Sequence, residues 1–126
     1  MKPEERKEAF RRRTKQYASA VIRLYCVLPK EREEVRVLGR QLLRSGTSVA
    51  ANYREASRAR SDAEFVSKIE TCAQEADETA LWLELLHDDC DIRTELLHML
   101  IKESNELIAI FVTMAKNVKN RDKDGK

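Results

Sequence analysis

The sequence predicts an all-α protein that folds as an antiparallel, up-down-up-down four-helix bundle and assembles as a homo-oligomer. Three observations predict this. Only 3 Gly and 2 Pro interrupt 126 residues, of which 37% are charged and 42% hydrophobic, and this balance is typical of amphipathic helices. Apolar residues recur every third or fourth position through four long segments, as one buried face of a helix requires. More apolar residues remain than four buried faces need, which favours contact between copies of the chain.

The first helix is predicted to begin near Glu4 or Arg11 and to end before Pro29. Proline lacks an amide hydrogen and disfavours a helical residue before it. Pro29 also suits an early position of the second helix, which is predicted to end near Ser57. The apolar stripes of these two helices are Phe10, Tyr17, Val21, Leu24, Tyr25 and Leu28, followed by Val35, Leu38, Leu42, Val49, Tyr53 and Ala56.

A run of small residues, Ser45 to Ser48, interrupts the stripe of the second helix. Glycine within a helix costs about 1 kcal/mol relative to alanine. A packed helix tolerates Gly46 where small side chains let another backbone approach closely. The run therefore predicts a tight helix–helix contact at this level of the bundle.

The third helix is predicted to begin at a capping box, in which Ser61 accepts a hydrogen bond from a free amide and Glu64 reaches back. The pattern breaks around Asp88 to Asp91, and Asp89 or Asp91 is the predicted cap of the fourth helix. The apolar stripes are Phe65, Ile69, Cys72, Ala76, Leu83 and Leu86, followed by Leu96, Leu100, Leu107, Phe111, Met114 and Val118. Short loops between all four helices make sequential helices antiparallel neighbours.

This organisation divides the chain into residues 1–13, a basic N-terminal extension that continues into the first helix, a bundle at 14–119, and a disordered polar tail at 120–126. The 3 cysteines are widely spaced and lack a CxxC pair, which favours free thiols in a reducing compartment. No apolar run approaches about 18 residues. We therefore expect a cytoplasmic protein that does not span a membrane.

Charge is unevenly distributed along the chain. Residues 1–16, 54–68 and 116–126 contain 16 Lys or Arg and 8 Asp or Glu, a net of +8, whereas the whole chain carries +2. An antiparallel bundle would bring these three segments to one end, the basic pole. Such a pole favours binding of RNA or DNA, or of a protein already bound to nucleic acid. The alternative is a solvated end that only increases solubility.

Arginines also form a row on the second helix, beside its apolar stripe: Arg36, Arg40, Arg44, Arg54 and Arg58. Guanidinium groups match phosphate oxygens, so a row can follow a nucleic-acid backbone. The alternative is structural, because Glu70, Asp77, Glu84 and Asp88 on the third helix could pair with this row. The residues predicted to contact nucleic acid are Arg11, Arg12, Arg13, Arg40, Arg44, Arg54, Arg58 and Arg60.

Apolar residues beside the core stripes of the third and fourth helices predict the surface through which copies associate. The alternative is a wide core stripe on both helices. The predicted interface residues are Leu81, Trp82, Leu85, Ile101, Ile108 and Val112.

A Glu-x-x-His motif occurs twice, at Glu84–His87 and at Glu95–His98. Di-iron bundles use this motif on two helices. Helical phase argues against a shared site, because His87 falls toward the core whereas Glu95 and His98 fall opposite the Leu96 stripe. No other catalytic arrangement is visible, so we expect no catalytic residue, cofactor or metal. A metal-dependent bundle enzyme is the less favoured alternative.

Three segments carry a family resemblance: GRQLLRSGTSVAANYREASRARSDAEF at 39–65, EADETALWLELL at 75–86 and ELIAIFV at 106–112. Together they resemble the four-helix-bundle proteins encoded in intervening sequences of bacterial 23S ribosomal RNA genes. The resemblance spans about residues 14–118. It implies an antiparallel bundle assembled as a homopentamer. The family it resembles is in turn more distantly similar to the accessory protein of diversity-generating retroelements, a pentamer whose basic surface engages nucleic acid and a reverse transcriptase. The resemblance implies no catalytic residues.

Overall fold

A computed structural model shows four helices and describes the backbone of residues 1–124 and the side chains of residues 1–121. The helices are α1 (Pro3–Val27), α2 (Glu33–Ala56), α3 (Asp62–Asp88) and α4 (Glu95–Asp124). No strand occurs in this described part of the chain. The predicted all-α four-helix bundle is therefore confirmed.

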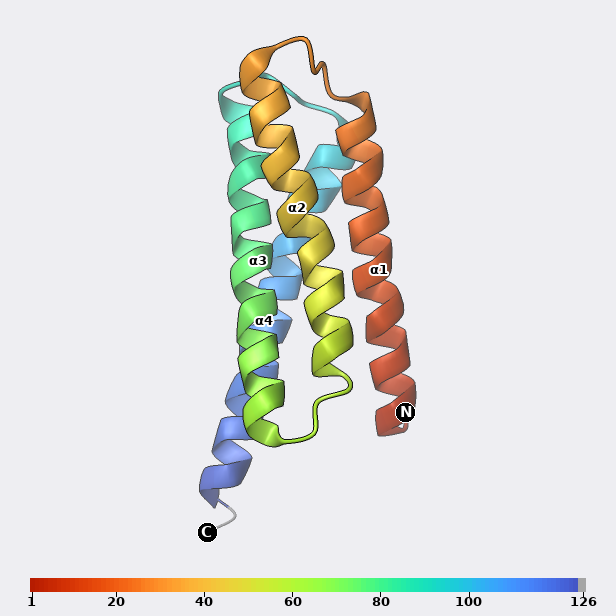
Figure 1. The fold of residues 1–126 in the computed structure, drawn as a ribbon, viewed down its shortest axis with the longest axis vertical. Coiled ribbons are helices and arrows are strands. Elements are labelled where there is room, and N and C mark those ends of the chain that lie inside the picture. The colour runs from red at the N-terminus through yellow and green to blue at the C-terminus, as the bar shows by residue number, and fades with distance from the viewer. Residues whose placement is uncertain (125–126) are drawn as a thin grey trace.

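The connections between helices lie at two ends of the bundle (Figure 1). The α1–α2 and α3–α4 connections share one end, and the N-terminus, the α2–α3 turn and the last turns of α4 lie toward the other. We call the first the loop end and the second the terminal end. The three segments predicted to form the basic pole all lie toward the terminal end.

Local signals set the helix boundaries, with three differences from prediction. Ser61 Oγ accepts from the Glu64 amide at 3.1 Å, so the predicted serine cap of α3 is present. The cap of α4 was predicted at Asp89 or Asp91, but the Leu97 amide donates to Thr94 Oγ1 at 3.2 Å. Asp91 instead adopts a left-handed conformation with φ 60°, which reverses the chain before the helix. The second difference lies at the start of α2.

Helix α2 begins at Glu33 rather than at Pro29, because residues 28–32 form a connecting turn. At the other end of the chain, α4 continues to Asp124. Backbone at 120–124 is therefore helical where a disordered tail was predicted. Residues 125 and 126 of that tail lie outside the described residues.

The core follows the predicted stripes closely, except on α4. Leu97 is buried and Leu96 is only half-buried, and Ala115 is buried where Met114 was predicted. The other predicted residues of this stripe, Leu100, Leu107, Phe111 and Val118, are buried. The largest fully buried side chains come from all four helices and include Leu24, Leu42, Leu83 and Phe111.

A buried layer of hydroxyl groups crosses the middle of the core. Tyr17 Oη and Ser104 Oγ lie 2.5 Å apart, and Thr79 Oγ1 donates to Ser45 Oγ at 2.7 Å. Each helix contributes one of these four residues. Burial raises the pKa of Tyr17 to about 12, so its hydroxyl keeps its proton at neutral pH. A satisfied polar layer favours one register of the four helices over others.

Gly46 lies beside this layer and confirms the predicted close contact. A Cβ on Gly46 would lie 2.8 Å from both methyl carbons of Val21, closer than real Cβ contacts allow. The absence of a side chain therefore lets α1 pack directly on the backbone of α2.

Candidate nucleic-acid interface

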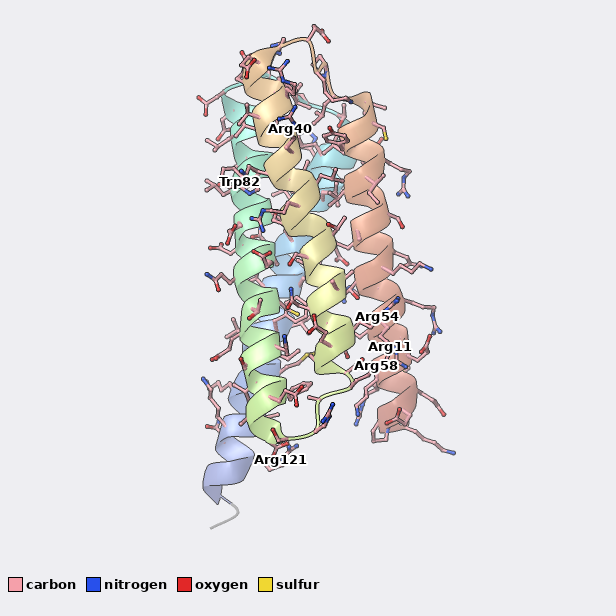
Figure 2. The ribbon with its side chains drawn as sticks, viewed as in Figure 1. Arg11, Arg40, Arg54, Arg58, Trp82 and Arg121 are labelled. Carbon is pink, nitrogen blue, oxygen red and sulfur yellow. The ribbon has the colours of Figure 1, made fainter. Side chains whose placement is uncertain are left out.

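The predicted arginines do not act as one row. Figure 2 shows Arg40 near the loop end, whereas Arg54 and Arg58 lie beside Arg11 toward the terminal end. The number of residues between them along α2 explains the separation, since each residue adds about 1.5 Å of rise. Arg40 and the pair Arg54 and Arg58 also have different neighbours. Only Arg54 and Arg58 face the cationic side chains of α1.

A shallow hollow between α1 and α2 collects the cations of the terminal end. It has a volume of about 340 Å³. The residues that line it are Glu8, Arg11, Arg12, Lys15, Arg54 and Arg58. We call this set the basic hollow. It contains five cationic side chains and one carboxylate, a net charge of +4.

A second hollow of about 360 Å³ adjoins the basic hollow along α2. It shares Arg11, Lys15, Arg54 and Arg58 with the first, and its floor includes Ala50 and Ala51. Because alanine side chains are small, α2 leaves space between the two helices here. A ligand that lies along the α1–α2 seam therefore has cationic side chains on both sides.

Glu8 is the one carboxylate that lines the basic hollow itself, and it neutralises part of the charge on α1. Arg11 Nη2 lies 2.6 Å from Glu8 Oε2, and Arg12 Nη1 lies 3.6 Å from Glu8 Oε1. The Arg11 guanidinium, by hydrogen bond and charge, holds the pKa of Glu8 below its ordinary value. Arg11 Nη1 also donates to Ser57 Oγ at 3.1 Å, which ties α1 to the end of α2.

Arg54 and Arg58 have no such neutralising contact. Among the side chains that the structure describes, no carboxylate oxygen lies within 4.0 Å of either guanidinium. Glu55, the acidic residue next to Arg54, pairs with Lys68 on α3 at 3.0 Å. The α2 side of the basic hollow therefore presents two guanidinium groups without acidic partners.

Arg60 lies at an adjacent hollow of about 380 Å³ at the terminal end. Lys7 of α1 and Arg121 of α4 line the same hollow, so the three cationic segments meet there. Arg121 Nη2 pairs with Asp62 Oδ1 at 3.2 Å, which reduces the free charge. The basic pole is therefore present at the terminal end of the bundle. The basic hollow contains the largest group of its cationic side chains.

Arg13 and Arg44 are engaged in ion pairs within the bundle. Arg13 forms a bidentate pair with Glu103 of α4, at 2.8 and 2.7 Å. Arg44 pairs with Glu75 and Glu78 of α3, at 3.2 and 2.9 Å. The ion-pair alternative is right for Arg44, but its partners are not the four acidic residues that were predicted. Glu70, one of those four, instead pairs with Lys119 at 2.6 Å.

The apolar residues predicted at an interface divide into two groups. Leu81 is 47% exposed and Val112 is 53% exposed. Trp82, Leu85, Ile101 and Ile108 are half-buried, and all but Leu85 pack against the core. The alternative of a wide core stripe therefore describes Trp82, Ile101 and Ile108. The indole N–H of Trp82 is buried, and no acceptor for it lies among the described residues.

The histidines of the two Glu-x-x-His motifs lie close together, which their predicted helical phases did not indicate. The rings of His87 and His98 lie 5.2 Å apart, yet no cluster of three or more His, Cys, Asp or Glu suited to a metal occurs among the described residues. Both His87 nitrogens have partners, with Asp88 Oδ1 at 2.8 Å and Arg93 Nη1 at 3.2 Å. His98 and Glu95 are exposed.

Sequence reasoning missed Lys15 as a member of the basic hollow. Its spacing from Arg11 and Arg12, one helical turn along α1, carried the signal. The contribution of α2 was predicted, because residues 54–68 were assigned to the basic pole together with residues 1–16. In the described part of the chain, none of the helices has the length and apolar character of a membrane span.

Comparison with known proteins gives a family and a similar fold. The sequence model of the 23S rRNA-intervening sequence protein family matches residues 6–113. A crystal structure from Bacteroides thetaiotaomicron, a protein of unknown function from the S23 ribosomal protein family, is similar with a TM-score of 0.78 and 34% identity. The similarity covers 87% of this chain and 97% of that one. No curated protein matches this chain.

Proposed function

This chain belongs to the 23S rRNA-intervening sequence protein family, and from that premise we propose that it is a non-enzymatic protein that binds RNA or DNA. The binding site in this proposal is the basic hollow, which takes the phosphates of the nucleic-acid backbone. The bundle is antiparallel and assembles as a homo-oligomer, a pentamer in our proposal. Assembly multiplies the number of basic hollows that one nucleic acid can meet.

The pair Arg54 and Arg58 is the observation that carries this proposal. Two guanidinium groups without acidic partners, next to Arg11, Arg12 and Lys15, repel one another unless an anion lies between them. Phosphate oxygens suit guanidinium geometry, because two parallel N–H groups can donate to two oxygens. A polyphosphate backbone is therefore the ligand that best matches the charge and chemistry of the basic hollow.

The basic hollow offers charge but no reading of bases. The nearest aromatic side chains, Phe10 and Tyr53, pack against each other inside the bundle with ring centroids 4.8 Å apart. Bases therefore have no stacking platform among the lining residues. Contacts limited to phosphate position a protein without specifying sequence, so binding should depend on salt and little on sequence.

The ion pairs of Arg13 and Arg44 favour a second candidate, a purely structural assembly or protein-interaction scaffold. In that case a nucleic-acid-associated protein, rather than the nucleic acid, is the partner. The three cysteines are free thiols, and we propose the cytoplasm as the compartment of either form.

A gel-shift or fluorescence-anisotropy titration of generic RNA and duplex DNA against salt tests the proposal. Replacing both Arg54 and Arg58 by Gln removes two phosphate contacts. We expect the affinity at low salt to fall by about 10- to 100-fold, and the slope of log K against log salt to decrease by about 2. Helix content should not change, because neither guanidinium has a carboxylate partner in the bundle.

The matched control is Arg36→Gln, which makes half that change in net charge at the loop end, where Arg36 pairs with Glu33. Binding of this variant should stay within about twofold of the wild type. Absence of any complex at low salt contradicts the proposal. Equal loss from Arg36→Gln and from Arg54→Gln alone would assign binding to overall charge rather than to the basic hollow.

A further inference from the structure

Between α1 and α4 the bundle has an open groove of about 410 Å³. Apolar Ala20, Leu96 and Met99 line it, and Arg23 and Lys102 stand on opposite rims. The Arg13–Glu103 ion pair crosses the same seam closer to the terminal end. We call this opening, with the residues that line it, the α1–α4 groove. Ala20, Arg23, Leu96 and Met99 belong to the last turns of α1 and the first turns of α4, which lie toward the loop end (Figure 1).

The α1–α4 groove has apolar side chains between charged ones, and an exposed apolar residue lies close to it on each helix. Met99 is 61% exposed, and Val27, two turns beyond Ala20 on α1, is 68% exposed. Val27 shares a helix face with Ala20 and Arg23, because they are spaced by three, four and seven residues. Exposed apolar patches rimmed by polar groups mark interaction sites.

The outer face of α3 has the complementary character. Leu81 is exposed at its centre, Leu85 is half-buried beside it, and Asp77 and Glu84 flank them. Helical spacing of three, four, seven and eight residues places these side chains on one side of α3. We call this set, with Trp82 at its edge, the α3 face.

The charges on both surfaces lack partners in the bundle. Within the described side chains, no opposite charge lies within 4.0 Å of Arg23 or Lys102, and none lies within that distance of Asp77 or Glu84. Glu103 and Glu106 also line the groove, but both lie within 4.0 Å of Arg13. The unpaired charges at the groove are therefore basic and those on the α3 face are acidic, so the two surfaces complement each other in charge as well as in apolar character.

We propose that the α3 face of one copy docks in the α1–α4 groove of the next copy. This inference rests on the homo-oligomer of the proposed function and identifies its two contacting surfaces. Leu81 and Leu85 enter between Ala20 and Met99, and Asp77 and Glu84 meet Arg23 and Lys102. Because the contact joins two different surfaces, it is heterologous, and each copy keeps one of each free until a ring closes.

The positions of the two surfaces favour a closed ring over a filament. Trp82 and the last turns of α3 lie in the half of the bundle near the loop end, as do the last turns of α1 and the first turns of α4 (Figures 1 and 2). Neighbouring copies can therefore sit side by side at the same height. A heterologous contact without axial offset forms a cyclic assembly when the rotation between copies closes.

Charge reversal tests this pairing. The groove variant, Arg23→Glu with Lys102→Glu, places acid against acid, and the face variant, Asp77→Lys with Glu84→Lys, places base against base. We expect each variant to weaken association by roughly 100-fold or more, seen as monomer in light scattering. All four substitutions on one chain restore opposite charges, so this combined variant should regain the wild-type mass.

Trp82 provides an independent readout, because it is the single tryptophan of the chain and lies at the edge of the α3 face. Its emission should shift to longer wavelength when either reversed variant dissociates and should return in the combined variant. Circular dichroism of all variants separates dissociation from unfolding, since helix content stays constant in the first case.

The outcomes separate this inference from the proposed function. A monomeric wild-type chain overturns both the homo-oligomer and the pairing. A wild-type oligomer that either reversed variant leaves intact overturns the pairing alone, as does a combined variant that stays dissociated. If instead the grooves of two copies contact each other, the chain would form a dimer. That dimer would dissociate in the groove variant and persist in the face variant, which also overturns the pairing. RNA binding by the basic hollow of each monomer is measured separately.

Discussion

The two seams that join α1 to the rest of the bundle are built in different ways. Against α2, Val21 packs on the bare backbone of Gly46, so the helices approach closely. Against α4, a groove separates the helices, and polar contacts cross it. These are the Tyr17–Ser104 hydrogen bond inside and the Arg13–Glu103 ion pair at the rim.

This difference explains why neighbouring arginines of α1 have different roles. Close approach at the α1–α2 seam brings Arg11, Arg12 and Lys15 beside Arg54 and Arg58, where cations outnumber acids. Arg13 points to the α1–α4 seam, where Glu103 and Glu106 are within 4.0 Å. Helix geometry turns successive side chains by about 100°, so adjacent residues face an anion-poor seam and an anion-rich one.

Enlarging Gly46 should have the largest effect on this contrast. Gly46→Leu places a side chain where Val21 methyl carbons already lie 2.8 Å from the ideal Cβ position. Because Val21 packs directly on the backbone of α2, which cannot rotate aside as a side chain can, the clash is removed only if α1 moves away. We expect a loss of roughly 3 kcal/mol in the free energy of unfolding, measured by urea denaturation.

Gly39→Ala is the matched control on the same seam. Its added Cβ would lie 3.1 Å from Leu28 Cδ1, the end of a flexible side chain that can rotate. Alanine also gains about 1 kcal/mol in helix propensity. Stability should therefore stay equal or rise slightly, and a loss as large as that of Gly46→Leu would contradict the assigned difference between the two glycines.

Removing the ion pair of the open seam should have an intermediate effect. Arg13 and Glu103 are half-buried and bidentate, so their interaction exceeds that of a typical exposed pair. A double-mutant cycle with Arg13→Gln and Glu103→Gln should give a coupling energy of about 1 kcal/mol, measured by thermal or urea unfolding.

Arg54→Gln provides the comparison for this cycle. Arg54 has no carboxylate partner among the described side chains, so its replacement should change stability by less than about 0.5 kcal/mol. A coupling energy near zero for Arg13 and Glu103 would show that the two seams do not differ in how they hold arginine.

Most of the fold could be predicted from the sequence because it depends on local patterns. The stripe from Val35 to Ala56 and the cap at Ser61 require only helical periodicity and one hydrogen bond. On α4 the prediction was wrong at the cap, which is Thr94 rather than Asp89 or Asp91. It was also wrong at Leu96, because Leu96 and Leu97 lie four and three residues before Leu100 and helical spacing fits both.

The candidate site was predictable in composition but not in arrangement. Arg54 and Arg58 were identified because arginines recur along one face of α2. Whether each one is neutralised depends on residues that approach from other helices, such as Glu75 and Glu78 at Arg44. Arg54 and Arg58 were predicted both in the arginine row and in the basic pole, and in the structure they line one hollow with the cations of α1, as the pole predicted.

Glu8 offers the smallest and most specific test of the basic hollow. It accepts from Arg11 at 2.6 Å, so Glu8→Gln should release this guanidinium and raise affinity for RNA by about threefold. Arg12→Gln is the opposite control and should lower affinity. Both changes are measured by fluorescence anisotropy at low salt.

The pH dependence of this effect has a definite sign. Arg11 holds the pKa of Glu8 below its ordinary value of 4.5, so the carboxylate stays charged from pH 8 down to pH 5. Wild type and Glu8→Gln should therefore differ by the same factor across this range. Because the pKa is lowered, Glu8 takes up its proton only at pH values well below 4.5, and there the two affinities should converge. Weaker binding by Glu8→Gln at pH 7 would mean that Arg11 contacts the nucleic acid only when Glu8 orients it, or that the phosphates bind elsewhere.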